Sequence, residues 1–174
     1  MTRNLTGTEL KRLHRERRRA TEGRVALILE DVQNPFNLGA IVRTAAAMGV
    51  DHLWPVGATP PLAHPKVQKT ALGTQRYLST SPGAPITAAM SQARDDGFEI
   101  IGIELAEGAT PLNELGDVAD VALVVGHEDR GLSKVALAAC DRVVYVPQVG
   151  KVASLNVATA AAVALYEVRR HHWA

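Results

Sequence analysis

Short, unbroken runs of apolar residues recur along the chain and alternate with longer segments of helical pattern. The runs at 25–29, 98–103, 121–125 and 143–146 consist mainly of Val, Ile, Leu and Ala. Strands have this composition when both of their faces are buried, as in a parallel sheet covered by helices. The alternation therefore predicts a single α/β domain with a mostly parallel sheet and helices on both faces.

Residues that are typical of helix starts lie between these runs. Ser133 stands before an apolar segment and Pro85 lies near a first turn, and both are typical helix starts. Asn34-Pro35 indicates a turn, whereas the type of the segment leading to Leu78 stays open. The expected helices are 38–48, 85–96, 133–140 and a long one from about 155, with a further strand at 51–56.

Composition narrows the class of protein. A chain of 174 residues with 47% apolar and 21% charged residues fits one folded domain and excludes a disordered chain. Aromatics are 4%, which disfavours a surface built mainly on base stacking. Cys140 is the single cysteine, so no internal disulfide or cysteine-based zinc site is expected, and a reducing, cytoplasmic compartment is predicted. No apolar run reaches the roughly 18 residues of a membrane span.

The charge is concentrated at the start of the chain. Residues 1–24 hold eight Lys/Arg and three Glu, a balance of +5, whereas 25–174 hold eleven Lys/Arg and fifteen Asp/Glu, a balance of −4. Thr6 and Glu9 fit a capping box, so a basic helix is expected before the main domain. This helix either contacts a polyanion or is a solvated surface. The predicted organisation is a basic extension at 1–24 and one domain at 25–174.

Polar motifs follow three of the expected strands, where ligands bind in parallel α/β folds. They are Asn37-Leu-Gly-Ala-Ile-Val-Arg43, Gly126-His-Glu-Asp-Arg-Gly-Leu-Ser133 and Pro147-Gln-Val-Gly-Lys-Val-Ala-Ser-Leu-Asn156. Each has a structural alternative: Arg43 as a surface charge, Glu128 as a turn cap and Asn156 as a helix cap. Their joint occurrence at strand ends favours a site.

Common nucleotide and metal sites do not fit these motifs. No G-x-G-x-x-G follows a strand, which argues against a nicotinamide site. Gly126 and Gly131 have the spacing of a P-loop, but Leu132 stands where the phosphate-binding lysine is needed. His127 and Glu128 have no second histidine at metal-ligand spacing, so no metal is expected.

The three motifs, in this order, resemble those of the SpoU branch of the SPOUT superfamily, the α/β-knot RNA methyltransferases. The resemblance extends from about 25 to 169. It implies a deep trefoil knot at the C-terminal end of the sheet, and methyl transfer from S-adenosylmethionine to a ribose 2′-hydroxyl of tRNA or rRNA. It places Arg43 at the catalytic centre, with Asn37, Glu128, Ser154 and Asn156 around it. It also implies a cofactor pocket at Ile103, Gly126, Val146, Gly150 and Leu155, where the glycines would let the main chain approach the ligand.

Arginine is almost never deprotonated, so we expect Arg43 to bind a phosphate and stabilise developing alkoxide charge rather than act as a base. The resemblance further implies a homodimer through the C-terminal helix, whose alternative is a core helix in a monomer. The short extension favours tRNA over rRNA, and a knotted RNA-binding protein without catalysis is a third possibility. The expected phosphate contacts are Lys11, Arg12, Arg15, Arg17, Arg18, Arg19, Lys66, Lys69 and Arg76.

Overall fold

The structure is a computed structural model that describes residues 2–173. Residues 1 and 174, the outer limits of the two predicted segments, lie outside the described residues. Within 2–173 the helices are α1 (Gly7–Ala20), α2 (Pro35–Ala47), α3 (Pro65–Ala71), α4 (Ile86–Asp95), α5 (Lys134–Ala139) and α6 (Val157–His172). The strands are β1 (Val25–Glu30), β2 (His52–Val56), β3 (Ser79–Thr80), β4 (Glu99–Ile103), β5 (Thr110–Pro111), β6 (Val121–Val125) and β7 (Arg142–Tyr145).

The strands form one sheet in the order β3-β2-β1-β6-β4-β7-β5, and every pairing between them is parallel. The prediction of a mostly parallel sheet is confirmed. Strands β2 and β3 lie on one side of β1 and the later strands on the other, so the strand order reverses between β1 and β6. These two strands pair from Val25 with Val121 to Leu29 with Val125. In open α/β sheets a ligand crevice forms where the strand order reverses, at the carboxyl ends of the strands.

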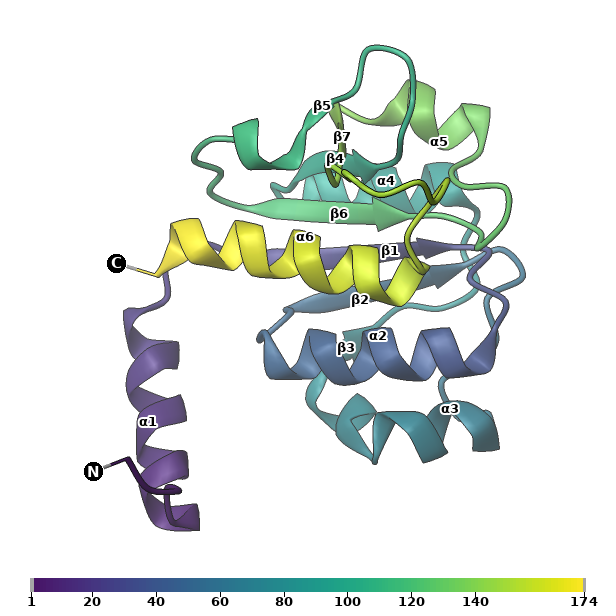
Figure 1. The fold of residues 1–174 in the computed structure, drawn as a ribbon. Coiled ribbons are helices and arrows are strands. Elements are labelled where there is room, and N and C mark those ends of the chain that lie inside the picture. Colours follow the sequence, from purple (N-terminus) through teal and green to yellow (C-terminus); the bar gives the residue numbers. More distant parts are fainter. Residues whose placement is uncertain (1, 174) are drawn as a thin grey trace.

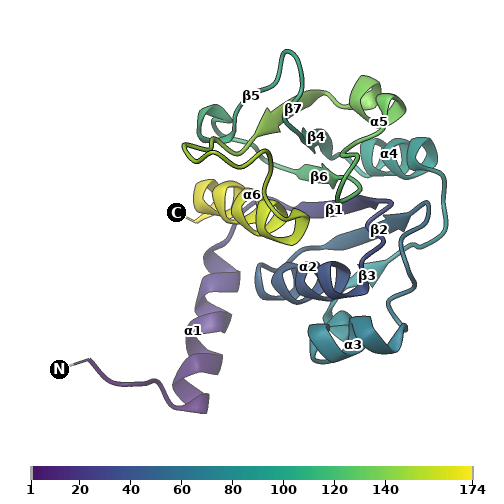
Figure 2. The ribbon, with the colours of Figure 1, turned by 45° about the vertical axis from the view of Figure 1, so that its right-hand side comes forward.

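Helices cover both faces of the sheet, as predicted (Figure 1). Alternate residues of a strand point to opposite faces. Accordingly, Leu27 and Leu29 of β1 belong to a core shared with α2 and α6, whereas Ala26 and Ile28 belong to a second core shared with α4 and α5. Figure 2 shows the same layers, with α4 and α5 on one side of the sheet and α2, α3 and α6 on the other.

Helix α2 begins earlier than the sequence pattern indicates. Pro35 occupies its first turn, and the Asn34 side chain accepts a hydrogen bond from the Phe36 N–H at 2.9 Å. Asn34-Pro35 is therefore a helix start and not only a turn, because proline lacks the N–H that a first turn leaves unpaired. The open segment before Leu78 is α3 and a 3₁₀ turn, Thr74–Tyr77. Ser133 caps α5 as predicted.

Helix α1 extends away from the domain (Figures 1 and 2). Its capping box between Thr6 and Glu9 is present as predicted, and none of its residues is buried. Leu5, Leu10 and Leu13 remain 40–51% exposed, so its leucines do not contribute to the core. The helix joins the domain near its end, where Thr21 forms a β-bridge with Trp173.

The basic helix lies at the amino ends of the strands, whereas the motifs lie at the carboxyl ends. The six residues of β1 run from the end of α1 to the loop before α2, a length of about 20 Å. Helix α6 (Val157–His172) runs back along the sheet, and its C-terminal end meets the end of α1 at the Thr21–Trp173 bridge. Figure 1 shows this separation. No helix in the described range 2–173 is long and apolar enough to cross a membrane.

Candidate active site

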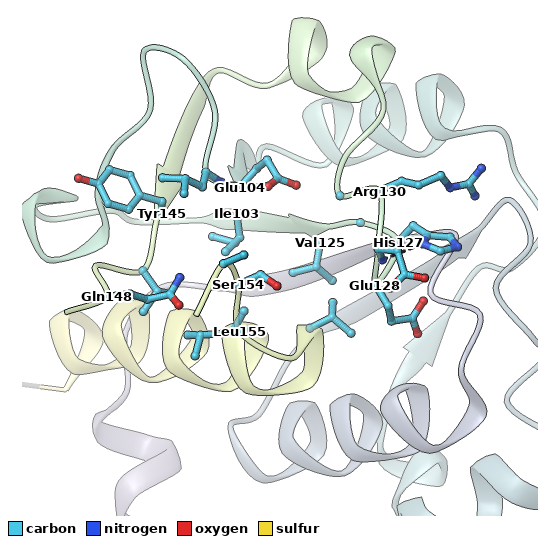
Figure 3. A pocket seen from close by; sticks show the side chains of 18 residues that line it. Ile103, Glu104, Val125, His127, Glu128, Arg130, Tyr145, Gln148, Ser154 and Leu155 are labelled. Carbon is cyan, nitrogen blue, oxygen red and sulfur yellow. Dashed lines mark hydrogen bonds between the residues drawn. The ribbon is translucent and has the colours of Figure 1, made fainter. Parts of the chain in front are cut away.

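A cavity of about 310 Å³ lies at the carboxyl ends of β4, β6 and β7 (Figure 3). Three loops line it: the residues after β4, the 126–131 loop after β6 and the 146–155 loop after β7. Segments that are far apart in sequence meet here because parallel strands end at the same edge of the sheet. The size is within the range of pockets that bind small molecules and cofactors, roughly 300–1,000 Å³.

The cavity has an apolar wall and acidic groups. Ile103, Gly126, Val146 and Leu155 line it, four of the five residues expected at a cofactor pocket. Gly150 is not among the lining residues, and a Cβ at that position would meet no atom within 4 Å. The structure therefore gives no steric reason for glycine at this position.

Gly126 lines the cavity and also has a structural role in its own loop. A Cβ at this position would collide with the backbone of Gly131 and Leu132 rather than occupy open ligand space. The 126–131 loop closes on itself through paired backbone hydrogen bonds between His127 and Gly131, at 3.1 and 2.9 Å. Gly126 therefore allows the loop to close tightly, which shapes one wall of the cavity.

Glu128 connects the 126–131 loop to the start of α2. Its carboxylate accepts hydrogen bonds from the Gln33 N–H at 3.2 Å, the Asn34 N–H at 2.9 Å and the Asn37 side-chain amide at 3.2 Å. In Figure 3 this side chain points toward α2, while Arg130 of the same loop points away from the cavity. Glu128 thus joins two motifs.

These bonds determine the charge of Glu128. Burial opposes ionisation of its carboxyl group, but hydrogen bonds from its own backbone N–H, from Asn34, from the Asn37 amide and from Gln33 outweigh burial and lower its pKa. The group is a fixed carboxylate at neutral pH. It therefore has no proton to give as a general acid near pH 7.

Asn156 extends the same cluster to the third motif. Its side-chain N–H donates to the Asn37 side-chain oxygen at 2.9 Å. Its own oxygen accepts from the N–H groups of Ala158 and Thr159, so it also caps α6. The capping alternative is correct and compatible with the site. We call Glu128, Asn37 and Asn156 the polar cluster.

Ser154 and Arg43 differ in their positions. Ser154 lines the cavity (Figure 3). Arg43 is exposed on α2 and is not among the lining residues. The structure of one chain thus brings four of the five expected catalytic residues to the cavity or its rim. It leaves Arg43 apart from them.

Two carboxylates at the ends of strands belong to none of the predicted motifs. Glu104 accepts from the N–H groups of Leu105 at 3.0 Å and Leu132 at 2.9 Å, and so connects two walls of the cavity. Glu30 is only 6% exposed and binds both the N–H and the hydroxyl of Ser133, at 2.9 and 2.7 Å. Their signal in the sequence is an acidic residue directly after an apolar run, where a buried charge needs donors.

The expected phosphate contacts lie in two groups. The six cations of α1 are on the protruding helix, where Arg17 also lies 6.0 Å from the Trp173 ring. Lys66, Lys69 and Arg76 belong to α3 and the following 3₁₀ turn, which pack beside α2. Of these three, Lys66 is the one that lies close to the polar cluster, where it helps to line an open groove.

A parallel α/β sheet with a cavity at the carboxyl ends of its strands, and a polar cluster drawn from three motifs beside it, is typical of a ligand-binding site in this class of fold. Residues 24–166 match the model of the SpoU rRNA Methylase family. The chain belongs to this family, which confirms the resemblance seen in its motifs.

Individual relatives agree with this assignment. The chain is 34% identical over 145 residues to the 23S rRNA (guanosine-2′-O-)-methyltransferase RlmB of Acinetobacter baylyi, covering 83% of this chain and 58% of the relative. An AdoMet-bound rRNA methyltransferase from Sinorhizobium meliloti superposes with a TM-score of 0.80 at 27% identity, covering 87% and 58% of the two chains. The chain thus spans little more than half the length of these relatives.

A third relative is nearer in size. A structure described as giving insights into the 2-OH methylation of C/U34 on tRNA has a TM-score of 0.75 and 31% identity. The match covers 86% of this chain and 96% of that one. The fold prediction is confirmed by these structures, whereas the trefoil knot stays a prediction.

Proposed function

We propose that this protein transfers a methyl group from S-adenosylmethionine to a ribose 2′-hydroxyl of tRNA. The polar cluster carries the proposal, since Glu128, Asn37 and Asn156 bring all three family motifs together beside the cavity. A site of this kind needs fixed polar groups beside a pocket that binds the cofactor.

The cavity suits S-adenosylmethionine. Ile103, Val146 and Leu155 offer apolar contacts for an adenine ring, and the carboxylates of Glu104 and Glu128 suit a cofactor that carries a sulfonium and an amino group. The AdoMet-bound relative of the same fold supports this cofactor. When bound, S-adenosylmethionine supplies an electrophilic methyl group.

The polar cluster has a positioning role in this proposal. Glu128 is held as a carboxylate by three residues of the α2 start, and it fixes the amide of Asn37. Asn37 in turn accepts from Asn156. The two amides are neutral and can hold a ribose hydroxyl without competing for its proton. A fixed orientation of the nucleophile is a large share of what such a site supplies.

Arg43 enters the proposal through a second copy of the chain. We infer a homodimer through α6, whose inner residues Ala161, Ala164 and Leu165 are buried in its own core. Its outer side leaves Val163 39% and Tyr166 52% exposed. Helix α2 packs against α6. A pair of copies joined along α6 would bring Arg43 of one chain to the cavity of the other, to bind phosphate and stabilise developing alkoxide charge.

Two observations bear on the RNA. The relative of similar length concerns methylation of tRNA, which favours tRNA. The relative from Acinetobacter is an rRNA enzyme, which makes rRNA the second candidate. The deep trefoil knot belongs to the same proposal, on the resemblance alone.

The test is methyl transfer from labelled S-adenosylmethionine to total tRNA and, separately, to rRNA, both from cells lacking this protein, followed by mapping of the labelled nucleotide. Label in a 2′-O-methylated nucleotide of tRNA is the expected result. Label only in rRNA would keep the chemistry and replace the substrate. The absence of both label and cofactor binding would favour an RNA-binding protein without catalysis.

A further inference from the structure

An open groove of about 540 Å³ lies next to the cavity, on the α2 side of the 126–131 loop. Phe36 and Lys66 line one part of it, and His127 and Asp129 line another. We call it the Phe36 groove. His127, Glu128 and Asp129 line both the groove and the cavity. The two spaces are therefore adjacent, with the polar cluster at their boundary.

Phe36 contributes little to the fold. It lies in the first turn of α2 and is 53% exposed, whereas Leu38 and Val42 of the same helix are fully buried. A phenylalanine in this position forgoes much of the stabilisation that burial of its ring would give. Its exposed ring offers a flat apolar surface at the entrance of the site.

Lys66 lies beside this ring. Its Nζ is 6.0 Å from the centre of the Phe36 ring, and it comes from a different helix, α3. An aromatic ring next to an ammonium group matches a nucleotide, which presents a base and a phosphate a short distance apart. A purely apolar partner would not need the lysine.

The His127 ring supplies a further hydrogen-bond donor. The Asp129 N–H donates to His127 Nδ1 at 3.0 Å, so the neutral imidazole carries its proton on Nε2. Nε2 of this tautomer is therefore a hydrogen-bond donor. Such a donor suits a phosphate oxygen or a base carbonyl.

The acidic residues of the groove do not exclude RNA. The Glu128 carboxylate is already bound by donors from Gln33, Asn34 and Asn37. Asp129 is exposed and can accept from the exocyclic amino group of a base. The groove thus offers a stacking surface, a cation, a donor and an acceptor.

We propose that the Phe36 groove binds an RNA nucleotide that neighbours the methylated one, with its base on Phe36 and its phosphate at Lys66. The inference rests on the proposed function, because it takes the cavity as the place of methyl transfer. It assigns Phe36, which no motif of the sequence singled out, to substrate binding.

Binding is tested first without catalysis. Phe36→Trp places a fluorescent reporter in the groove, and Val135→Trp, on α5 across the sheet and 54% exposed, is the matched control. Both variants keep Trp54 and Trp173, whose emission in the wild-type protein is the common background. A short single-stranded RNA of mixed sequence should quench the added indole of the Phe36→Trp variant, since bases stack on indole, and leave that of the Val135→Trp variant unchanged. Equal quenching in the two variants would overturn the proposal, as would a Phe36→Trp signal that follows protein concentration instead of RNA.

Catalysis provides the second readout, on whichever RNA the wild-type protein methylates. Phe36→Ala should raise KM about five- to one-hundred-fold with kcat and cofactor affinity nearly unchanged, and Phe36→Trp should restore KM. Lys66→Gln should raise KM and reduce the salt slope of binding by about 0.7–0.9. Unchanged KM in Phe36→Ala would overturn the inference while the methyltransferase proposal stands. Quenching of the Phe36→Trp variant by RNA without any methyl transfer would support the groove and contradict the reaction.

Discussion

The side-chain N–H of Asn156 donates to the side-chain oxygen of Asn37 at 2.9 Å, across 119 positions of sequence. The side-chain N–H of Asn37 in turn donates to the Glu128 carboxylate at 3.2 Å. A side-chain amide can accept from one neighbour through its oxygen and donate to the other through its nitrogen. The pair therefore sets the orientation of both amides at the edge of the cavity.

Replacement of Asn37 by Asp tests this arrangement with almost no change in shape. The new carboxylate would face that of Glu128, which raises the pKa of one of the two. Methyl transfer should fall by at least tenfold at neutral pH and recover in part as the pH is lowered and one carboxyl group is protonated. The pH profile of kcat measures this. Asn113→Asp, at an exposed position of the 3₁₀ turn Leu112–Glu114, is the control and should keep the wild-type profile.

The lowered pKa of Glu128 predicts how the free energy of unfolding depends on pH. Its pKa in the folded protein lies below the ordinary value of 4.5, so its stabilising effect is present above that value and is lost as the pH falls through the lower, folded pKa. Glu128→Gln should reduce the free energy of unfolding by about 1–3 kcal/mol at pH 7, since the donors of Gln33, Asn34 and Asn37 lose a charged acceptor.

Urea unfolding of wild type and Glu128→Gln at a series of pH values checks this. The difference between the two proteins should shrink below pH 4.5 and remain constant above about pH 6. A difference that grows on acidification would contradict the assignment of a fixed carboxylate.

Much of this architecture follows from the sequence because strand burial leaves a strong signal. The apolar runs at 25–29 and 121–125 are the two central strands, and they pair directly. Parallel strands then bring Asn37, Glu128 and Asn156 to one edge. The polar cluster could be anticipated as a set of residues, whereas its bonds depend on side-chain positions that no spacing specifies.

Other features could not be read from the pattern. Glu30 and Glu104 are marked in the sequence by an acidic residue directly after an apolar run, but their donors, the backbone of Ser133 and of Leu132, are known only once the loops are placed. That Gly126 is also needed for its own loop to close follows only from the structure, where the nearest backbone is that of Gly131 and Leu132. The sequence did not predict that α2 begins at Pro35, because Asn34-Pro35 is compatible with both a turn and a helix start.

The buried side chain of Arg169 is predicted to contribute strongly to stability. It is 3% exposed and donates to the backbone oxygens of Gly23, Met48 and Gly49, which close the end of α2 and the approach to β1. Arg169→Ala would remove the donors of these three backbone oxygens together with the buried side chain that links them, so we expect a loss of about 3–5 kcal/mol in the free energy of unfolding.

Chemical denaturation measures this loss. The neighbouring Arg170 is exposed and pairs with Glu167, so Arg170→Ala should change stability by less than about 1 kcal/mol. Similar losses in both variants would show that the buried hydrogen bonds of Arg169 are not the reason.

The basic helix α1 predicts a strong dependence of RNA binding on salt. Its six cations are Lys11, Arg12, Arg15, Arg17, Arg18 and Arg19. Their joint replacement by Gln keeps a helix-forming side chain and removes the charge. RNA affinity should fall, and the slope of log K against log salt should become flatter by about 0.7–0.9 for each lost phosphate contact. Because no residue of α1 is buried, the unfolding temperature should change little. An unchanged slope would exclude the helix from RNA contact.

Arg43 gives the most direct test of the catalytic proposal. Arg43→Ala should abolish turnover and leave cofactor binding intact, because the side chain is exposed on α2 and does not line the cavity. Calorimetry with S-adenosylmethionine and the methylation assay separate the two effects. Arg94→Ala, at an arginine on α4 across the sheet that pairs with Asp141, should keep full activity. Loss of cofactor binding together with turnover in Arg43→Ala would contradict the assignment.

A mixture of the Arg43→Ala variant and the strongly impaired Asn37→Asp variant, assayed at neutral pH, then shows at which chain's cavity Arg43 acts. If Arg43 acts at the cavity of a second copy, a mixed dimer of Arg43→Ala and Asn37→Asp chains contains one site with both residues intact. Random pairing of equal amounts gives mixed dimers in about half of the population, so activity should return to about a quarter of wild type. If Arg43 acts within its own chain, every site carries one defect and the mixture is no more active than the two variants measured separately. Recovered activity would therefore establish both the homodimer and the placement of Arg43 across it.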